Sequence, residues 1–167
     1  MGDAPLGQSV LPGCGCLNRC LLDRFPEWEM VHQTGEGEFP RFAALPHHSR
    51  HSIVPFIEAV DEAMEGARFL LSRAGAATCA ELRAAGRGAI LVPLPGSALD
   101  HQRRNALAME KEGRARVVEQ GDRFSERLAA CAGELMADSA LRVALERPEP
   151  NRAVELCLDD LAALLGL

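Results

Sequence analysis

The chain has 167 residues, a formal net charge of −6 at pH 7 and a sequence pI near 5.4. This length suits one domain with an adequate core, and the acidic balance argues against a general nucleic-acid binder, so any anion must be held locally by helix ends and a few arginines. No stretch approaches the roughly 20 apolar residues of a membrane span, and the start MGDAPLGQ lacks the basic and apolar regions of a secretory signal. We therefore expect a cytoplasmic protein that does not insert directly into a membrane.

The six cysteines are interpreted as reduced thiols. Three lie between residues 14 and 20, and the other three stand alone in helical patterns. A zinc site that combines the first three with His47, His48 and His51 is an alternative, although the chain has no CxxC pair.

The first third of the chain predicts a helix and two strands. We expect a helix over residues 17–25, a strand over 29–32, a polar loop over 36–50 and a short strand over 52–54. His32 is interpreted as a structural residue and not as a catalytic one. The exit turns of the two strands are Gln33-Thr34-Gly35 and Pro55-Phe56-Ile57.

The middle of the chain predicts alternating helices and strands. We expect helices over 58–66, 77–85 and 100–112 and strands over 69–71, 89–94 and 115–119. Such alternation implies an α/β, Rossmann-like parallel sheet with helices on both faces and ligands outside the carboxyl ends of the strands. The remainder predicts helices, with apolar stripes over 122–136 and on a last helix from Val154 to Leu165.

The turn after the strand at 69–71 is a candidate phosphate site. Gly75 and Ala76 keep the approach to the backbone open, and the first N–H groups of the following helix have no intrahelical partner. Thr78 and Glu81 lie on one helix face, where a carboxylate can accept hydrogen bonds from a ribose diol. The alternative is an ordinary strand-to-helix turn in which Glu81 is a solvated charge.

The turn after the strand at 89–94 is a candidate sugar site. Pro93 and Pro95 end the strand, and a helix opens at Asp100. His101 and Asn105 share one face of this helix and Gln102 is next to it, so imidazole and amide groups at the helix entrance can read hydroxyls. A capped helix with ordinary polar residues would explain the same pattern.

Several segments in this order carry a resemblance to a known family: Arg73-Ala74-Gly75-Ala76-Ala77-Thr78, Glu81-Leu82, Ala84-Ala85-Gly86, Ala89-Ile90-Leu91-Val92-Pro93, Asp100-His101-Gln102 and Asn105-Ala106. They resemble the C-terminal, donor-binding half of the MurG-like glycosyltransferases of family 28. The similarity extends from about His32 to about Gln120. These enzymes have the GT-B fold and transfer N-acetylglucosamine from UDP-N-acetylglucosamine to a lipid-linked muramyl-pentapeptide precursor of peptidoglycan.

The resemblance implies a donor site in which Phe56 covers the uracil and the backbone of Ile57 hydrogen-bonds its edge. As an alternative, Phe56 is a core residue. Leu11 stands where the family has a serine that meets the donor diphosphate. No metal, cofactor or catalytic residue is implied. The implied substrate-binding residues are Phe56, Ile57, Arg73, Gly75, Ala76, Ala77, Thr78, Glu81, His101, Gln102 and Asn105.

The domain organisation is also an expectation from the resemblance. We expect one family-28 C-terminal-like domain with an atypical start over 1–24, a donor-binding core over 25–120 and a helical part over 121–167. The full enzymes react their substrates in a cleft between two Rossmann-like domains, and this chain resembles only the second. The acceptor-binding half must then come from another chain, which could also bring the protein to the inner face of the cell membrane, and the isolated chain is not expected to be active.

Three functions are compatible with these residues. The first is the UDP-N-acetylglucosamine-binding domain of a MurG-like N-acetylglucosaminyltransferase. The second is a sugar-nucleotide-binding protein without transfer activity, and the altered region at Leu11 favours it. The third is a UDP-sugar epimerase, although no convincing pair of acid and base groups is found for it.

Overall fold

The structure is a computed structural model, which describes residues 14–96 and 100–147. The elements are as follows: α1 Cys14–Arg24, β1 Met30–Gln33, α2 Phe39–Ala43, β2 His51–Val54, α3 Val60–Gly66, β3 Leu70–Ser72, α4 Ala76–Ala85, β4 Ala89–Leu91, α5 His101–Lys111, β5 Ala115–Val117, α6 Phe124–Ala137 and α7 Ser139–Leu145. Strands and helices alternate as far as α6, so the predicted α/β class is confirmed.

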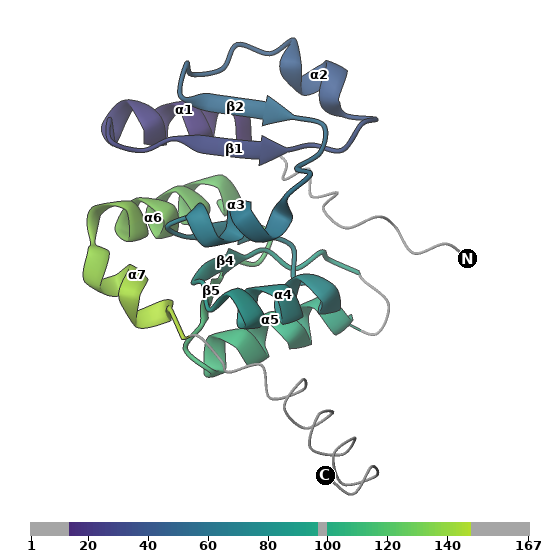
Figure 1. The fold of residues 1–167 in the computed structure, drawn as a ribbon, viewed down its shortest axis with the longest axis vertical. Helices are drawn as coiled ribbons and strands as arrows, with labels where there is room; N and C mark the ends of the chain where they lie inside the picture. Colours follow the sequence, from purple (N-terminus) through teal and green to yellow (C-terminus); the bar gives the residue numbers. More distant parts are fainter. Residues whose placement is uncertain (1–13, 97–99, 148–167) are drawn as a thin grey trace, which may run out of the picture.

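The strands form two parallel sheets. In the first, β1 pairs with β2 so that Met30 lies opposite His51; in the second the order is β3-β4-β5, and Leu70 lies opposite Ala89. A helix connects each pair of neighbouring strands, because a parallel connection must return the chain to the opposite end of the sheet. Figure 1 shows β1 and β2 at one end of the molecule and β4 with α4 and α5 towards the other.

The break between the sheets leaves one edge of β1 without a strand partner among the described residues. Met30 and Thr34 donate their backbone N–H groups towards β2, to Arg50 O at 2.9 Å and Val54 O at 3.0 Å. Because alternate residues of a strand point their peptide groups to opposite edges, the N–H of Val31 points away from β2. The side chain of Val31 is 62% exposed, which marks this strand as less covered than β4.

Helices cover both faces of the three-stranded sheet, as predicted. In β4, Ala89 and Leu91 pack in a cluster with Leu82 of α4 and Met109 of α5. Ile90 and Val92 point to the other face and pack with α1 and α6, because successive side chains of a strand alternate. These four consecutive residues, 89–92, are fully buried, so β4 is the central strand of the described core.

One apolar cluster joins the two sheets. It contains Trp28, just before β1, and Phe69, just before β3, whose rings meet edge to face at 5.5 Å. Leu22 of α1 and Leu128 of α6 belong to the same cluster. The amino ends of β1 and β3 therefore lie close together over a shared core, although the two strands do not pair.

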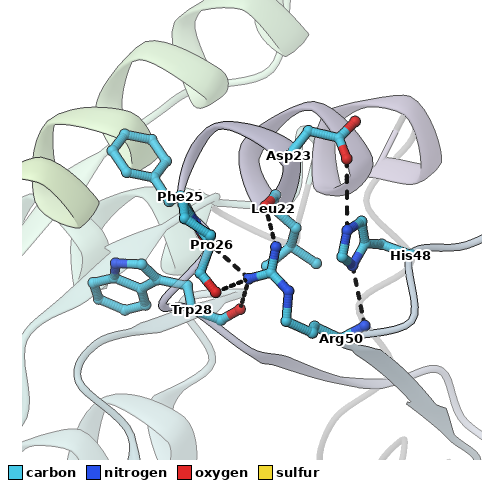
Figure 2. Close-up of polar contacts among 7 residues, drawn as sticks. All are labelled: Leu22, Asp23, Phe25, Pro26, Trp28, His48 and Arg50. Carbon is cyan, nitrogen blue, oxygen red and sulfur yellow. Dashed lines mark hydrogen bonds and ion pairs between the residues drawn. The ribbon is translucent and has the colours of Figure 1, made fainter.

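Arg50 fastens the end of α1 to the start of β2. Its guanidinium donates hydrogen bonds to the carbonyl oxygens of Leu22, Phe25, Pro26 and Trp28, as Figure 2 shows. The last carbonyls of a helix have no intrahelical donor, and a cation is favourable at this end of the helix dipole. This single side chain thus donates hydrogen bonds both to α1 and to the chain between α1 and β1.

Three details differ from the predictions. The residues 36–50, expected as a loop, contain the short helix α2, which Pro40 can begin because its missing N–H would be unpaired there in any case. The strand expected over 89–94 ends at Leu91, and the helix α7, which follows α6 directly with Asp138 as its N-cap, was not predicted. The helix expected from Val154 to Leu165 and the altered residue Leu11 lie outside the described residues. Within the described ranges, no helix is long and apolar enough to cross a membrane.

Candidate functional site

The predicted site residues follow the carboxyl ends of the strands in two groups. Phe56 and Ile57 follow β2 of the two-stranded sheet, and the other nine follow β3 and β4 of the three-stranded sheet. In parallel sheets the loops beyond the carboxyl ends are the usual place for a ligand.

The amino end of α4 has the features of an anion site. Gly75 is the residue before the helix, with an extended backbone and no side-chain cap, and the first intrahelical bond is from Cys79 N to Gly75 O at 2.9 Å. The N–H groups of Ala76, Ala77 and Thr78 therefore precede the first helical bond and carry the positive end of the helix dipole. Both alanines are exposed, so small side chains leave these N–H groups accessible.

Thr78 and Glu81 lie one turn apart on α4, as expected. A Cβ placed on Gly75 would lie 3.7 Å from Thr78 Oγ1, so the hydroxyl faces back to the first turn. Glu81 is half-buried. The helix thus presents backbone N–H groups, a hydroxyl and a carboxylate in succession along its first turns.

Arg73 links the exits of three strands. Its Nη1 donates to Val92 O at 3.2 Å, to Pro93 O at 3.4 Å and to Gln120 Oε1 at 3.2 Å. These acceptors belong to the segments after β4 and β5. The side chain is half-buried, and it holds protein loops in this structure.

Two amides of α5 close this set of contacts into a ring. Gln102 Oε1 accepts a hydrogen bond from Leu94 N at 2.9 Å, and Asn105 Nδ2 donates to Ala74 O at 3.1 Å. Ala74 follows Arg73 in the chain, and Leu94 follows the two carbonyls that Arg73 contacts. The loops after β3 and β4 and the first turns of α5 are therefore cross-braced as one unit.

The entrance of α5 differs in one respect from an ordinary capped helix. Asp100 has a left-handed backbone (φ 56°) and its side chain makes no capping bond, so the first turn of α5 keeps its N–H groups uncapped by that residue. His101 is exposed, whereas Gln102 is half-buried.

Phe56 and Ile57 form the second group. Phe56 is 53% exposed and is thus not a core residue. The N–H of Ile57 donates to Gln33 Oε1 at 2.9 Å, which joins the exits of β1 and β2. An aromatic ring beside a backbone held in this way can cover a planar base.

A histidine cluster is formed by residues of β1, of β2 and of the segment just before β2. His32 and His51 stack at 5.6 Å between ring centroids, and Asn18 Nδ2 lies 3.5 Å from His51 Nε2. Burial, followed by the neighbouring imidazoles of His32, His47 and His48, lowers the pKa of His51 to about 4. Burial also lowers the pKa of His32, so both rings are neutral packing groups, which supports the structural interpretation of His32.

The described residues contain no group of three or more His, Cys, Asp and Glu side chains that could hold a metal ion. Cys20, Cys79 and Cys131 are free thiols. Burial raises the pKa of Cys79 and of Cys131, so these two remain protonated and weakly nucleophilic.

Sequence reasoning did not include Gln33 and Gln120 among the site residues. Each uses its amide oxygen to tie one strand exit to another, to Ile57 N and to Arg73 Nη1. Gln33 lies within a segment that carried the family resemblance, which was the available signal. Gln120 lies at the end of the region of similarity and directly after the strand expected over 115–119.

Comparison with known proteins agrees with this architecture. The model of the glycosyltransferase family 28 C-terminal domain matches residues 15–151. The UDP-N-acetylglucosamine--N-acetylmuramyl-(pentapeptide) pyrophosphoryl-undecaprenol N-acetylglucosamine transferase of Sorangium cellulosum (strain So ce56) is 42% identical over 124 residues, which are 72% of this chain and 31% of that protein. The protein of the same name from Syntrophotalea carbinolica is 38% identical over 147 residues, which are 81% of this chain and 41% of that protein.

Solved structures of glycosyltransferases share this fold. The crystal structure of Acinetobacter baumannii MurG matches with a TM-score of 0.67 and 27% identity, over 93% of this chain and 50% of that chain. The glycosyltransferase VinC in complex with dTDP matches with a TM-score of 0.59 and 17% identity, over 79% of this chain and 34% of that chain, a likeness of fold alone.

Parallel strands, connecting helices and a braced carboxyl edge define a Rossmann-like α/β domain of the kind found in glycosyltransferases. The chain belongs to the glycosyltransferase family 28 C-terminal domain family. It spans about a third to two fifths of the length of the curated relatives described above.

Proposed function

We propose that this chain binds UDP-N-acetylglucosamine and forms the donor-binding part of an N-acetylglucosaminyltransferase. The observation that carries the proposal is the accessible amino end of α4 beside a braced pair of loops. The uncapped N–H groups, Thr78 and Glu81 belong to the first turns of α4, and Gln102 belongs to the first turn of α5 and accepts the N–H of Leu94. The names of the relatives, which are N-acetylglucosamine transferases, support the same conclusion.

Each group then has a chemical role. The N–H groups of Ala76, Ala77 and Thr78, together with the helix dipole, would hold the diphosphate. Glu81 would accept hydrogen bonds from the ribose diol. Phe56 would cover the uracil, and the backbone of Ile57, whose N–H is held by Gln33 Oε1, would offer its carbonyl oxygen to the edge of the base.

The sugar would be read from α5. Because Gln102 Oε1 accepts the N–H of Leu94, its Nε2 group is directed elsewhere and can donate to a sugar oxygen. His101 is exposed next to it. Asn105 and Arg73 then act mainly by holding the loops in place, through Ala74 and the β4 exit.

We also propose that transfer needs a second polypeptide. Transfer breaks the bond between the anomeric carbon and the diphosphate and forms a bond to an acceptor hydroxyl, which must be deprotonated and aligned. This chain matches 31% and 41% of the length of two relatives, and the acceptor-binding half would lie outside the matched part. A lipid-linked acceptor would place this assembly at the inner face of the cell membrane.

For the domain we propose a donor-binding core over residues 25–120 and a helical part from 121 onwards. Gln120 contacts Arg73, and α6 and α7 follow it in the chain. The helical part supports the core through Leu128 and Leu135, which pack against β4.

Calorimetric titration of the full chain with UDP-N-acetylglucosamine, UDP and UDP-glucose tests the proposal. We expect binding of all three, with UDP-N-acetylglucosamine the tightest, and we expect Glu81→Ala to weaken UDP binding by about 1–3 kcal/mol through loss of a hydrogen-bonding partner. Glu134→Ala, which removes an exposed carboxylate from the last turn of α6, is the matched control and should bind as the wild type does. Equal affinity in Glu81→Ala would remove the ribose role, and no heat with any ligand would overturn the proposal.

A further inference from the structure

Gln120 lies at a point that is fixed from several sides. The strand β5 continues its pairing as far as Val118, whose N–H donates to Leu91 O at 3.0 Å. The next residue, Glu119, accepts a hydrogen bond from Arg127 Nη2 on its backbone at 2.7 Å and an ion pair from Arg103 Nε on its side chain at 2.8 Å. The contacts of these two preceding residues therefore fix the position of the Gln120 backbone, independently of the Gln120 side chain.

The side chain of Gln120 meets the guanidinium that holds the β4 exit. Its Oε1 lies 3.2 Å from Arg73 Nη1, the same nitrogen that contacts the carbonyls of Val92 and Pro93. An acceptor on this nitrogen restricts where the guanidinium can point, because the donors of arginine are held in a rigid plane. Without the Gln120 oxygen, Arg73 keeps its charge but loses one of the contacts that orient its guanidinium.

We propose that Gln120 is a positioning residue for donor recognition, which it serves by orienting Arg73. The contacts run from Gln120 to Arg73, from Arg73 to the β4 exit, and from Leu94 in that exit to Gln102. The inference rests on the proposed function, since it concerns how the sugar-reading end of the same site is held.

This series of contacts supports the sugar-reading end of the site more than the phosphate-binding end at α4. Gln102 belongs to the sugar-reading end, whereas the first turn of α4 is built by its own helix and is joined to α5 through Asn105 and Ala74. Loss of the Gln120 contact should therefore affect the sugar more than the diphosphate. A purely structural role would affect both ligands equally.

The test compares calorimetric dissociation constants for UDP-N-acetylglucosamine and UDP in wild-type protein, Gln120→Leu and Gln120→Glu. In Gln120→Leu, which has similar size and no acceptor, we expect UDP-N-acetylglucosamine to bind about tenfold more weakly and UDP to change less than about threefold. In Gln120→Glu, which keeps an acceptor for Arg73, we expect both constants to stay within about threefold of the wild type. Glu126→Gln, which weakens the exposed ion pair between Glu126 and Arg123, is the control and should match the wild type.

Arg73→Lys provides a second variant should Gln120→Leu fail to fold. A lysine ammonium is a single point of charge and cannot reproduce the planar set of donors that contacts the β4 exit and Gln120 together, so we expect the same selective loss of sugar binding. Wild-type constants for both ligands in Gln120→Leu, or an equal loss for both, would overturn the inference while the proposed function stands. Failure of the wild-type chain to bind either ligand would instead overturn the proposed function, and the inference with it.

Discussion

Gln102 and Leu94 are joined by a hydrogen bond of 2.9 Å from the backbone N–H of Leu94 to the side-chain oxygen of Gln102. This contact ties the first turn of α5 to the exit of β4 and sets the orientation of the amide. Its oxygen faces the protein, so the NH₂ group is the part that remains to meet a ligand.

The orientation of this amide predicts the effect of Gln102→Glu. A carboxylate can still accept the N–H of Leu94, so the free energy of unfolding should change by less than about 0.5 kcal/mol, as at other surface sites. The second oxygen would replace a donor with a negatively charged acceptor, and UDP-N-acetylglucosamine should bind about tenfold more weakly, or worse. Urea unfolding and calorimetry on the same preparation separate the two effects, and unchanged affinity would show that this amide does not face the ligand.

Arg50 should contribute more to stability than an exposed arginine. It donates to the carbonyl oxygen of Leu22 in the last turn of α1 and to those of Phe25, Pro26 and Trp28, which follow the helix. We expect Arg50→Ala to lower the free energy of unfolding by about 2–3 kcal/mol, and Arg50→Lys to recover only part of it, because an ammonium cannot span all four oxygens.

Urea unfolding monitored by circular dichroism measures this effect. Arg41→Ala is a suitable control, because Arg41 makes an exposed ion pair with Glu38 at 3.0 Å that contributes little. A loss in Arg50→Ala no larger than that in the control would contradict the role given to the guanidinium.

The histidine cluster predicts a loss of stability at mildly acidic pH. The pKa of His51 is lowered to about 4 in the folded protein, while the unfolded chain has the ordinary value of 6.5. The unfolded chain therefore binds a proton first, so this stabilisation is complete above pH 6.5 and is lost as the pH falls towards 4, by up to about 3 kcal/mol. His51 is only 5% exposed, so solvent does not cancel the effect.

The pH dependence is measured by urea unfolding between pH 7 and pH 5, for wild-type protein and His51→Phe. The phenyl ring keeps the stacking on His32 and does not titrate, so the slope of stability against pH should be smaller in the variant. His32, whose pKa is also lowered by burial, would contribute to the remaining slope. Identical slopes would exclude His51 as the source.

The break between the sheets predicts an uneven pattern of hydrogen exchange along β1. The peptide groups of Met30 and Thr34 bond to β2, whereas the N–H of Val31 points to the edge that has no strand partner within the described residues. We expect the Val31 amide to exchange much faster than the amide of His32, because exchange follows the loss of a hydrogen bond. Equal protection of the two amides would show that another segment pairs with this edge.

Local sequence signals were sufficient for most elements of the fold. Apolar strands followed by Gly75 or by Pro93 and Pro95 predicted β3, α4, β4 and α5 in the correct order, because periodicity and turn residues act over short distances. The helix α2 was missed because five residues with a proline give too short a pattern to distinguish from a loop. The division into two sheets depends on pairing between distant segments, which no local pattern encodes.

The position of the candidate site residues along the strand exits could be predicted from the sequence, whereas the contacts of these residues could not. The sequence placed Arg73, Gln102 and Asn105 at the correct edge of the sheet, whereas the structure shows that each also holds a loop through a backbone group. Gln33 and Gln120 act in the same way across strand exits 24 and 47 residues apart in the chain. Such contacts join segments that only the folded chain brings together.

The most direct test of the central claim is an NMR titration of ¹⁵N-labelled full chain with UDP-N-acetylglucosamine, read at the backbone amides. Binding at the amino end of α4 predicts saturable shifts at Ala76, Ala77 and Thr78 and in the first turn of α5, with little change at the amides of α7. No shifts at millimolar ligand, or shifts confined to residues away from the exits of β2, β3 and β4, would contradict the claim that this edge of the sheet binds a nucleotide sugar.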